Sequence, residues 1–170
     1  PFPRAPGGYT YVVVAVDYFT KWVEAEALIS ITGQAIQKFF WKHVVCRFEL
    51  PRIVISDNGK QFADNLFKAW CEELRIKQYF TSVGHPQANG QAEKFNRTLL
   101  HGLKIRLDQL GTSCLDELPS VLWSYRTTPR TATQETPFSL TYGSEAVVPA
   151  KFLISSPRIA AFAAKANEEE

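Results

Sequence analysis

Three acidic residues have the type and placement needed for metal-dependent chemistry, although they are far apart in the chain. Asp17 follows the apolar run YTYVVVAV, Asp57 follows RIVIS, and Glu93 is the single carboxylate between Leu74 and Leu107. Hard divalent cations take oxygen ligands, and two such ions can clamp the attacking and leaving oxygens of a phosphoryl displacement. Carboxylates gathered from separate elements repel one another unless cations neutralise them, so such a cluster would serve chemistry rather than stability.

Each acid alone also has a simpler interpretation. Asp17 could be a turn residue after a strand, and Asp57 in the sequence SDNG could form an Asx turn. Glu93 could favour the dipole at a helix N-terminus, worth about 0.3–1 kcal/mol. The three acids considered together support a metal site better than each does alone, because 35 residues, 58 to 92, separate Asp57 from Glu93.

The first elements that would position these acids follow from hydrophobic periodicity. Residues 9–17 and 21–29 are predicted to be two strands paired in a hairpin, the second with its charged residues on a wet face. Thr32 is expected to cap a helix that runs to about residue 48. The core side of that helix would carry Ile36, Phe39, Phe40, Val44 and Phe48.

The remaining elements alternate strands with helices. Residues 52–56 and 77–82 are predicted strands, and a helix begins at Asp64 or Asn65 and ends near residue 74, with Phe67, Trp70, Cys71 and Leu74 inward. Residues 83–90 read as a mobile loop, 91–109 and 115–127 as helices, and 128–149 as turn-rich. Early strands followed by alternation predict an α/β fold with a mixed central β-sheet flanked by helices.

Composition excludes several classes of protein. A length of 170 residues fits one domain, and no apolar run is long enough for a membrane span. The net charge of +2 hides a basic stretch at residues 74–107. This stretch contains one acid, Glu93, and six basic residues, Arg75, Lys77, Lys94, Arg97, Lys104 and Arg106. Three cysteines without paired spacing exclude a zinc ribbon and favour a reducing compartment. The absence of methionine suggests a piece of a longer polypeptide.

Four segments resemble one known family. VDYFTKW, ISDNGKQF and HPQANGQAEKFNRTLL are similar to the catalytic core of retroviral and retrotransposon integrases, and TPFSLTYGSEAVVP resembles the segment that follows the core in Ty3/gypsy elements. This resemblance covers residues 9–149. It implies a ribonuclease H-like fold in which Asp17, Asp57 and Glu93 are the catalytic acids and bind two Mg²⁺ or Mn²⁺ ions.

The resemblance also implies an organisation and an activity. Residues 1–8 would be a lead-in, 9–150 the catalytic core, and 151–170 a partly disordered tail. The implied enzyme is a polynucleotidyl transferase and endonuclease: water trims the 3′ end of element DNA, and the new 3′-hydroxyl attacks target DNA. Its expected partners are double-stranded DNA and further copies of itself, in the nucleus. The zinc-binding and DNA-binding domains that flank the family's core are not found in these residues, so full activity is expected to need more than this fragment.

Several polar residues are expected to contact DNA. Arg97 lies one helical turn after Glu93, where it could hold a phosphate, although a solvated helix face is the alternative. The full set is Asn58, Gln61, His85, Gln87, Asn89, Gln91, Asn96, Arg97 and Lys104. Gly84 and Gly90 would act as loop hinges. Retroviral members often carry a basic residue seven positions after the Glu, where this chain has Leu100.

Two other classes remain open from the residues alone. One is a non-catalytic nucleic-acid-binding module whose acids are remnants of descent. The other is a ribonuclease H-type nuclease, which usually relies on four carboxylates, with Asp64 the nearest extra candidate.

Overall fold

The computed structural model describes residues 8–81, 90, 94–98, 114–131 and 133–147. All of the loop predicted at 83–90 except Gly90, the tail at 151–170 and most of the helix predicted at 91–109 lie outside these residues. Residues 94–98 are helical as predicted, whereas Gly90, predicted to be the last loop residue, is helical. No helix in the described part of the chain is both long enough and apolar enough to cross a lipid bilayer.

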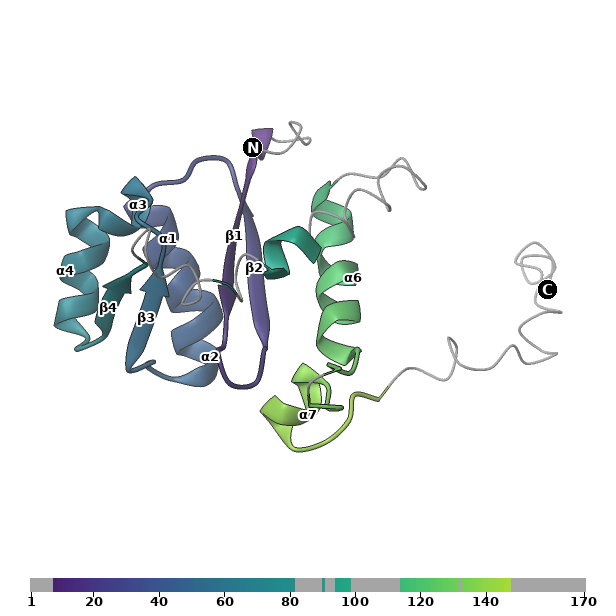
Figure 1. Cartoon of the computed structure of the whole chain (residues 1–170). Coiled ribbons are helices and arrows are strands. Elements are labelled where there is room, and N and C mark those ends of the chain that lie inside the picture. Colours follow the sequence, from purple (N-terminus) through teal and green to yellow (C-terminus); the bar gives the residue numbers. More distant parts are fainter. Residues whose placement is uncertain (1–7, 82–89, 91–93, 99–113, 132, 148–170) are drawn as a thin grey trace, which may run out of the picture.

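A β-hairpin forms the centre of the structure (Figure 1). Strand β1 (Tyr11–Val16) pairs antiparallel with β2 (Val23–Leu28), in a register that sets Tyr11 opposite Leu28 and Val16 opposite Val23. The predicted hairpin is confirmed. Alternate residues of a strand point to opposite faces, and here both faces are covered, one by α1 and the other by α6.

Helix α1 (Gly33–Phe40) begins where it was predicted, because the Thr32 hydroxyl accepts a hydrogen bond from the Ala35 N–H at 3.2 Å. It continues through a π-helical turn, η2 (Trp41–Val45), into the short α2 (Cys46–Phe48). Phe48 was expected in the core and is instead 37% exposed. Its ring contacts the edge of Trp22, with centroids 6.0 Å apart.

The second strand pair follows these helices. Strand β3 (Ile53–Ser56) leads through α3 (Lys60–Ala63) and α4 (Asn65–Glu73) to β4 (Lys77–Phe80), which pairs parallel with β3. Asp64 caps α4, since its carboxylate accepts from the Leu66 N–H at 3.3 Å. The start of α4 is confirmed, whereas α3 was not predicted.

The last two described helices lie on the other side of the hairpin (Figure 1). Helix α6 (Cys114–Thr127) matches its prediction, but α7 (Pro137–Tyr142) occupies a stretch predicted to be turns. Its signals are local: the Thr136 hydroxyl accepts from the Ser139 N–H, Pro137 opens the first turn, and Gly143 closes the helix at a φ of 73°.

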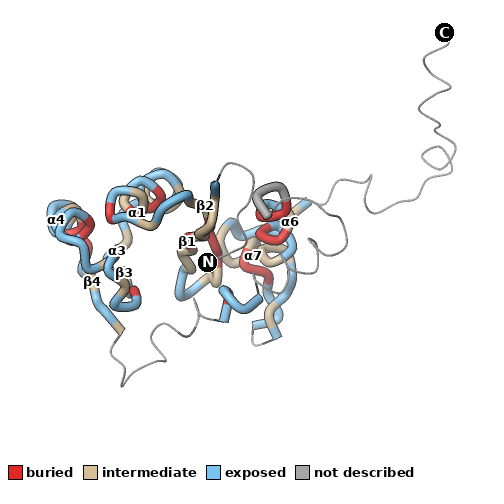
Figure 2. Tube along the Cα trace, turned by 90° about the horizontal axis from the view of Figure 1, so that it is seen from above, coloured by how far each residue is buried: buried red, intermediate tan, exposed pale blue. Residues whose placement is uncertain are grey.

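Two apolar clusters hold the elements together (Figure 2). One joins α1 and α4 to one face of β1, with Ile36, Phe39 and Phe67 almost fully buried. The other joins β2 to α6 and to the 94–98 segment through Val23, Phe95 and Leu122. The hairpin is therefore the shared wall between two cores.

The described strands do not form one continuous sheet. Hydrogen bonding joins β1 only to β2 and β3 only to β4. Antiparallel and parallel pairing both occur, as the prediction of a mixed sheet requires, but in separate pairs.

Candidate active site

Asp57 lies directly after β3 and its side chain shapes the turn that follows. Its Oδ1 accepts a hydrogen bond from the Gly59 N–H at 2.9 Å, which is an Asx turn, and the residue is exposed. The simpler interpretation of Asp57 is thus realised. It does not exclude a second role, because a carboxylate has about four acceptor positions and this bond uses one.

Asn58 ties the ends of β3 and β4 together. Its Nδ2 donates to the Thr81 carbonyl at 3.2 Å, and the Thr81 N–H donates to the Ser56 carbonyl at 2.9 Å. In the structure the amide nitrogen fixes the strand ends that carry Asp57. The DNA contact expected of Asn58 stays a prediction.

Gly59 leaves the space in which Asp57 and Gln61 sit. A Cβ at Gly59 would lie 2.8 Å from the Asp57 Oδ1 and would also clash with the Gln61 amide nitrogen. Contacts this short do not occur with a real Cβ, so a side chain there would displace one or both groups. Gln61 is therefore close to Asp57, in agreement with its predicted place beside this acid.

Asp17 occupies a different kind of turn. Its Oδ2 accepts hydrogen bonds from the N–H and the hydroxyl of Thr20, each at 2.7 Å, while the Asp17 N–H donates to the Trp22 carbonyl at 2.8 Å. Lys21, in the same turn, has a φ of 63°. The carboxylate of Asp17 thus stabilises the tight connection between β1 and β2.

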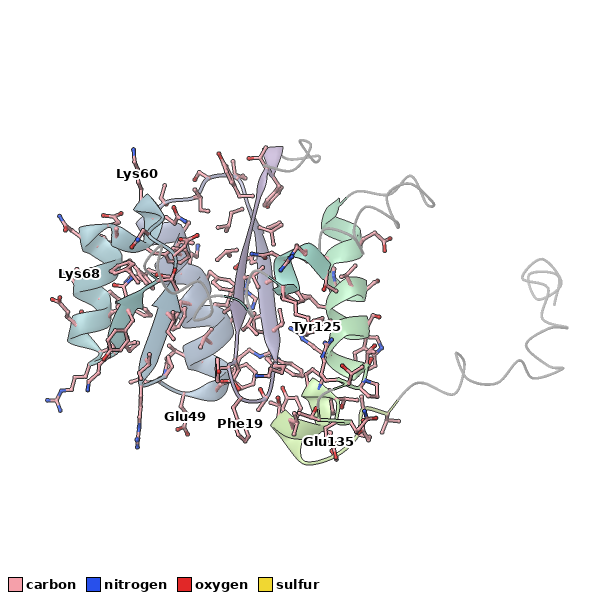
Figure 3. The ribbon with its side chains drawn as sticks, in the orientation of Figure 1. Phe19, Glu49, Lys60, Lys68, Tyr125 and Glu135 are labelled. Carbon is pink, nitrogen blue, oxygen red and sulfur yellow. The ribbon has the colours of Figure 1, made fainter. Side chains whose placement is uncertain are left out.

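The structure does not bring Asp17 and Asp57 together. The Asp17 end of the hairpin is joined by Glu24 to Arg47, at 2.6 Å, and so lies near the start of β3. The start of α1 lies at the opposite end of the hairpin from Asp17. There Gly33 contacts Asp64, which is close to the turn after β3. In Figure 3, Phe19 and Glu49 lie at the lower end and Lys60 at the upper end.

The strand directions explain this correction. Strands β1 and β3 run in opposite directions, so their last residues lie at opposite ends of the layer (Figure 1). A strand of six residues, as in β1, spans about 20 Å. Ligands of one metal pair cannot lie a strand length apart, so the prediction that Asp17 shares ions with Asp57 is not supported by this geometry.

Asp64, the extra acid of the nuclease interpretation, has a structural use. It caps α4 and contacts Gly33 at the start of α1. Across the described residues no three His, Cys, Asp or Glu side chains are grouped so as to hold a metal ion.

The helical segment at residues 94–98 is fixed by one aromatic side chain. Phe95 is 1% exposed and meets the Tyr125 ring edge-on, with centroids 4.5 Å apart. Asn96 and Arg97 beside it are exposed, as a DNA-contacting face requires. Of the predicted site residues, Glu93, His85, Gln87, Asn89, Gln91 and Lys104 lie outside the described residues.

Sequence reasoning missed a buried ionic cluster around Glu24. This residue was assigned to a wet strand face, yet it is 4% exposed because η2 and α2 cover that face. Its carboxylate accepts from the Trp22 indole N–H at 2.8 Å, from Arg47 at 2.6 Å and from Arg126 at 2.9 Å. The one available signal was the Arg and His content of the following helix.

Arg126 connects this cluster to the end of α6. Its guanidinium donates twice to the Val23 carbonyl and lies over the Trp22 ring, 4.4 Å from the centroid. Burial lowers the pKa of Arg126, and the adjacent Glu24 carboxylate opposes that shift. Burial likewise raises the pKa of the Cys71 thiol to about 11, which keeps it protonated and fits the structural role predicted for the cysteines.

A family model and curated relatives both match this chain. The integrase core domain family matches residues 1–86. The chain is 36% identical over 140 residues to the Gag-Pol polyprotein of avian reticuloendotheliosis virus, covering 82% of this chain and 12% of that protein. It is 32% identical over 141 residues to the Gag-Pol polyprotein of gibbon ape leukemia virus, covering 81% and 8%. The chain thus spans only a small part of these relatives.

Solved structures agree. The HTLV-2 integrase catalytic core domain in complex with magnesium, in its trimeric form, matches with a TM-score of 0.65 and 18% identity over 76% of this chain and 82% of that one. The simian T-cell lymphotropic virus intasome matches with a TM-score of 0.70 and 24% identity, over 81% and 50%. These likenesses establish the ribonuclease H-like fold, and the family match over residues 1–86 shows that the chain belongs to the integrase core domain family.

Proposed function

We propose that the chain is the catalytic core of an integrase from a Ty3/gypsy-type retrotransposon polyprotein. Its reaction would be phosphoryl transfer on DNA, in which water first cleaves a phosphodiester near the 3′ end of the element. The freed 3′-hydroxyl then attacks a target phosphodiester, forming one P–O bond as another breaks. The observation that supports this most is Asp57, exposed at the end of β3 in a chain that belongs to the integrase core domain family.

The metal ligands are proposed to be Asp57 and Glu93. The described residues alone do not fit a site for two ions, since no three His, Cys, Asp or Glu side chains among them are grouped so as to hold a metal. A divalent ion held there would supply Lewis-acid activation of a phosphate oxygen. Two Mg²⁺ or Mn²⁺ ions remain the proposed cofactors; magnesium is bound by the HTLV-2 relative.

The chain's own residues would orient Asp57 and hold DNA. The Gly59 N–H and the Asn58–Thr81 bond fix the turn that presents the carboxylate. Arg97 and Asn96, exposed on the segment held by Phe95, are proposed to contact DNA phosphates. Gln61, His85, Gln87, Asn89, Gln91 and Lys104 are further proposed DNA contacts.

Assembly and location are also proposals. We expect self-association, because related cores are described in dimeric and trimeric forms and in an intasome. The substrates would be the double-stranded DNA of the element's ends and of the target, and the site of action the nucleus.

The proposal is tested with a branched DNA that mimics the integration product. The full-length protein containing these residues is incubated with this DNA and Mg²⁺ or Mn²⁺, beside Asp57→Asn and Asp64→Asn. We expect strand joining in the wild type, its loss in Asp57→Asn, and its retention in Asp64→Asn, because asparagine still caps α4.

Other outcomes would identify a different function. DNA binding without any joining would contradict catalysis and indicate a binding module. Cleavage of an RNA–DNA hybrid that depends on both acids would instead indicate a ribonuclease H-type nuclease.

A further inference from the structure

The turn that presents Asp57 is tied to the neighbouring strand β4 at two points. On one side, the Asn58 amide donates to the Thr81 carbonyl, just past the end of β4. On the other side, the Gln78 side chain donates from Nε2 to the Phe62 carbonyl at 2.8 Å. The first bond joins the strand ends, whereas the second reaches from β4 to α3, which follows β3 and lies outside the β3–β4 ladder (Figure 1).

Phe62 carries this second contact back toward Asp57. While its carbonyl accepts from Gln78, its own N–H donates to the Gly59 carbonyl at 2.9 Å. The Gly59 N–H in turn donates to the Asp57 Oδ1 at 2.9 Å. Three hydrogen bonds, connected through the backbones of Phe62 and Gly59, therefore run from the Gln78 amide to the Asp57 carboxylate.

The same turn places a second amide beside the carboxylate. A Cβ on Gly59 would clash with both the Gln61 Nε2 and the Asp57 Oδ1, so these two groups lie over the same glycine. Gln61 belongs to α3, a single turn that is closed by the N–H groups of Phe62 and Ala63 donating to the Gly59 carbonyl. Any shift of α3 therefore moves the Gln61 amide relative to the Asp57 carboxylate.

Gln78 is poorly suited to a role in stability alone. Its Oε1 is buried and has no hydrogen-bond partner among the described residues. A buried acceptor without a partner loses its hydration and gains nothing in return. An apolar side chain of the same length would avoid this cost, so the amide is better explained by what its nitrogen holds in place.

We propose that Gln78 is a positioning residue of the proposed active site. By holding the Phe62 carbonyl it fixes α3, and thereby sets the orientation of the Asp57 carboxylate and of the Gln61 amide beside it. Gln78 itself touches no reacting group. This role rests on the proposed function, in which Asp57 is a catalytic acid.

Gln78→Met in the full-length protein tests this role, because it removes the donor and keeps the length of the side chain. We expect kcat for joining of the branched DNA to fall by about 10–100-fold, as for other residues that orient a catalytic ligand. KM for this DNA should stay within about twofold, since the exposed Asn96 and Arg97 are unchanged. The melting temperature should change little, because the lost bond is offset by removal of the buried Oε1.

Gln134→Met is the matched control. The Gln134 Nε2 donates to the Thr131 carbonyl at 2.9 Å, in the turn before α7, so the same substitution removes the same kind of bond. Joining should stay at the wild-type level. Gln78→Asn is the second test variant: it keeps the amide but is too short for its nitrogen to reach the Phe62 carbonyl, and should lose joining as Gln78→Met does.

The Gly59 amide reports on the same chain of bonds without an activity assay. Its proton resonance depends on the hydrogen bond to the Asp57 carboxylate and is followed in protein labelled with isotopic nitrogen at glycine. Gly59→Ala identifies the signal by removing it. We expect the signal to shift in Gln78→Met and to stay in place in Gln134→Met.

Three results would overturn the proposal. An unchanged Gly59 signal in Gln78→Met would show that the bonds do not couple Gln78 to Asp57. Losses of joining that follow the melting temperature in both Gln78→Met and Gln134→Met would make the Gln78 bond structural only. A rise in KM at unchanged kcat would place Gln78 in DNA binding.

Failure of the proposed function would look different. In that case the wild type joins no DNA, while the Gly59 signal still depends on Gln78. The orientation of the Asp57 carboxylate by Gln78 would then stand, and its use in strand joining would not.

Discussion

The two sides of the molecule differ in how their charged residues are treated. On the hairpin side, Glu24 of β2 is buried and bonded to Trp22, to Arg47 of α2 and to Arg126 of α6, so that β2, α2 and α6 are linked through one carboxylate. On the β3–β4 side, Asp57 is exposed and holds only a local turn. Buried charge thus serves to hold elements together, while the carboxylate proposed for chemistry is exposed.

The first prediction concerns the loss of the buried Glu24 carboxylate on the hairpin side. Glu24→Ala removes the partner of Arg47 and Arg126 and leaves the charge of Arg126, whose side chain is 17% exposed, in a poorly hydrated site. We expect the free energy of unfolding to fall by about 3–5 kcal/mol. Denaturant titration followed by circular dichroism measures this.

The matched control is Glu26→Ala on the same strand face. Its side chain is 34% exposed and pairs with Lys42 at 3.5 Å, so a loss of about 1 kcal/mol or less is expected. Equal losses in the two variants would contradict the special role of Glu24.

The second prediction separates activity from stability with two glycines. Gly59→Ala pushes against the Asp57 carboxylate, and we expect strand joining to fall by about 100-fold, as for a catalytic group misplaced by an ångström. Thermal stability should change little, because Gly59 has an ordinary φ of −57°.

The opposite pattern is expected at Gly143, which closes α7 at a φ of 73°. Gly143→Ala should cost about 1–2 kcal/mol of stability, since alanine resists the left-handed region, and leave strand joining intact. Assays of joining and of melting temperature on both variants decide the matter. Loss of activity in both would indicate a general folding defect.

The third and smallest effect concerns DNA affinity. Arg97→Ala should remove about one phosphate contact and lower the slope of log K against log salt by about 1. Lys38→Ala makes the same charge change on α1, across the hairpin from residues 94–98, and should leave the slope unchanged. Fluorescence anisotropy at several salt concentrations gives both slopes, and equal slopes for the two variants would assign Arg97 to a solvated face.

Local signals in the sequence predicted most elements of the fold. The hairpin, the caps at Thr32 and Asp64, and α6 follow from periodicity and capping chemistry. The prediction of turns over residues 128–149 missed α7, whose proline and glycine stand at the first helical position and just past the helix end. The burial of Glu24 could not be predicted, because alternation identifies a strand face but not what covers it.

The site was harder to predict for a reason of topology. Asp17 and Asp57 have the same local pattern, an apolar strand followed by an acid and a turn. Only the directions of β1 and β3 distinguish them, and strand direction depends on the path of the whole chain. The 35-residue spacing therefore pointed to Asp57 and Glu93 as one pair of ligands. The local pattern at Asp17 looked the same, but in the structure this residue stabilises the turn of the hairpin.

The most direct test compares strand joining by Asp17→Asn and Asp57→Asn in the full-length protein. Asparagine retains an acceptor for the turn bonds at both positions, so the two folds should survive equally, as checked by melting temperature. We predict that Asp57→Asn loses at least about 1,000-fold, or about 4 kcal/mol of transition-state stabilisation, while Asp17→Asn stays within about twofold of the wild type. A loss in Asp17→Asn as large as in Asp57→Asn, with the fold intact, would contradict an active site centred on the end of β3.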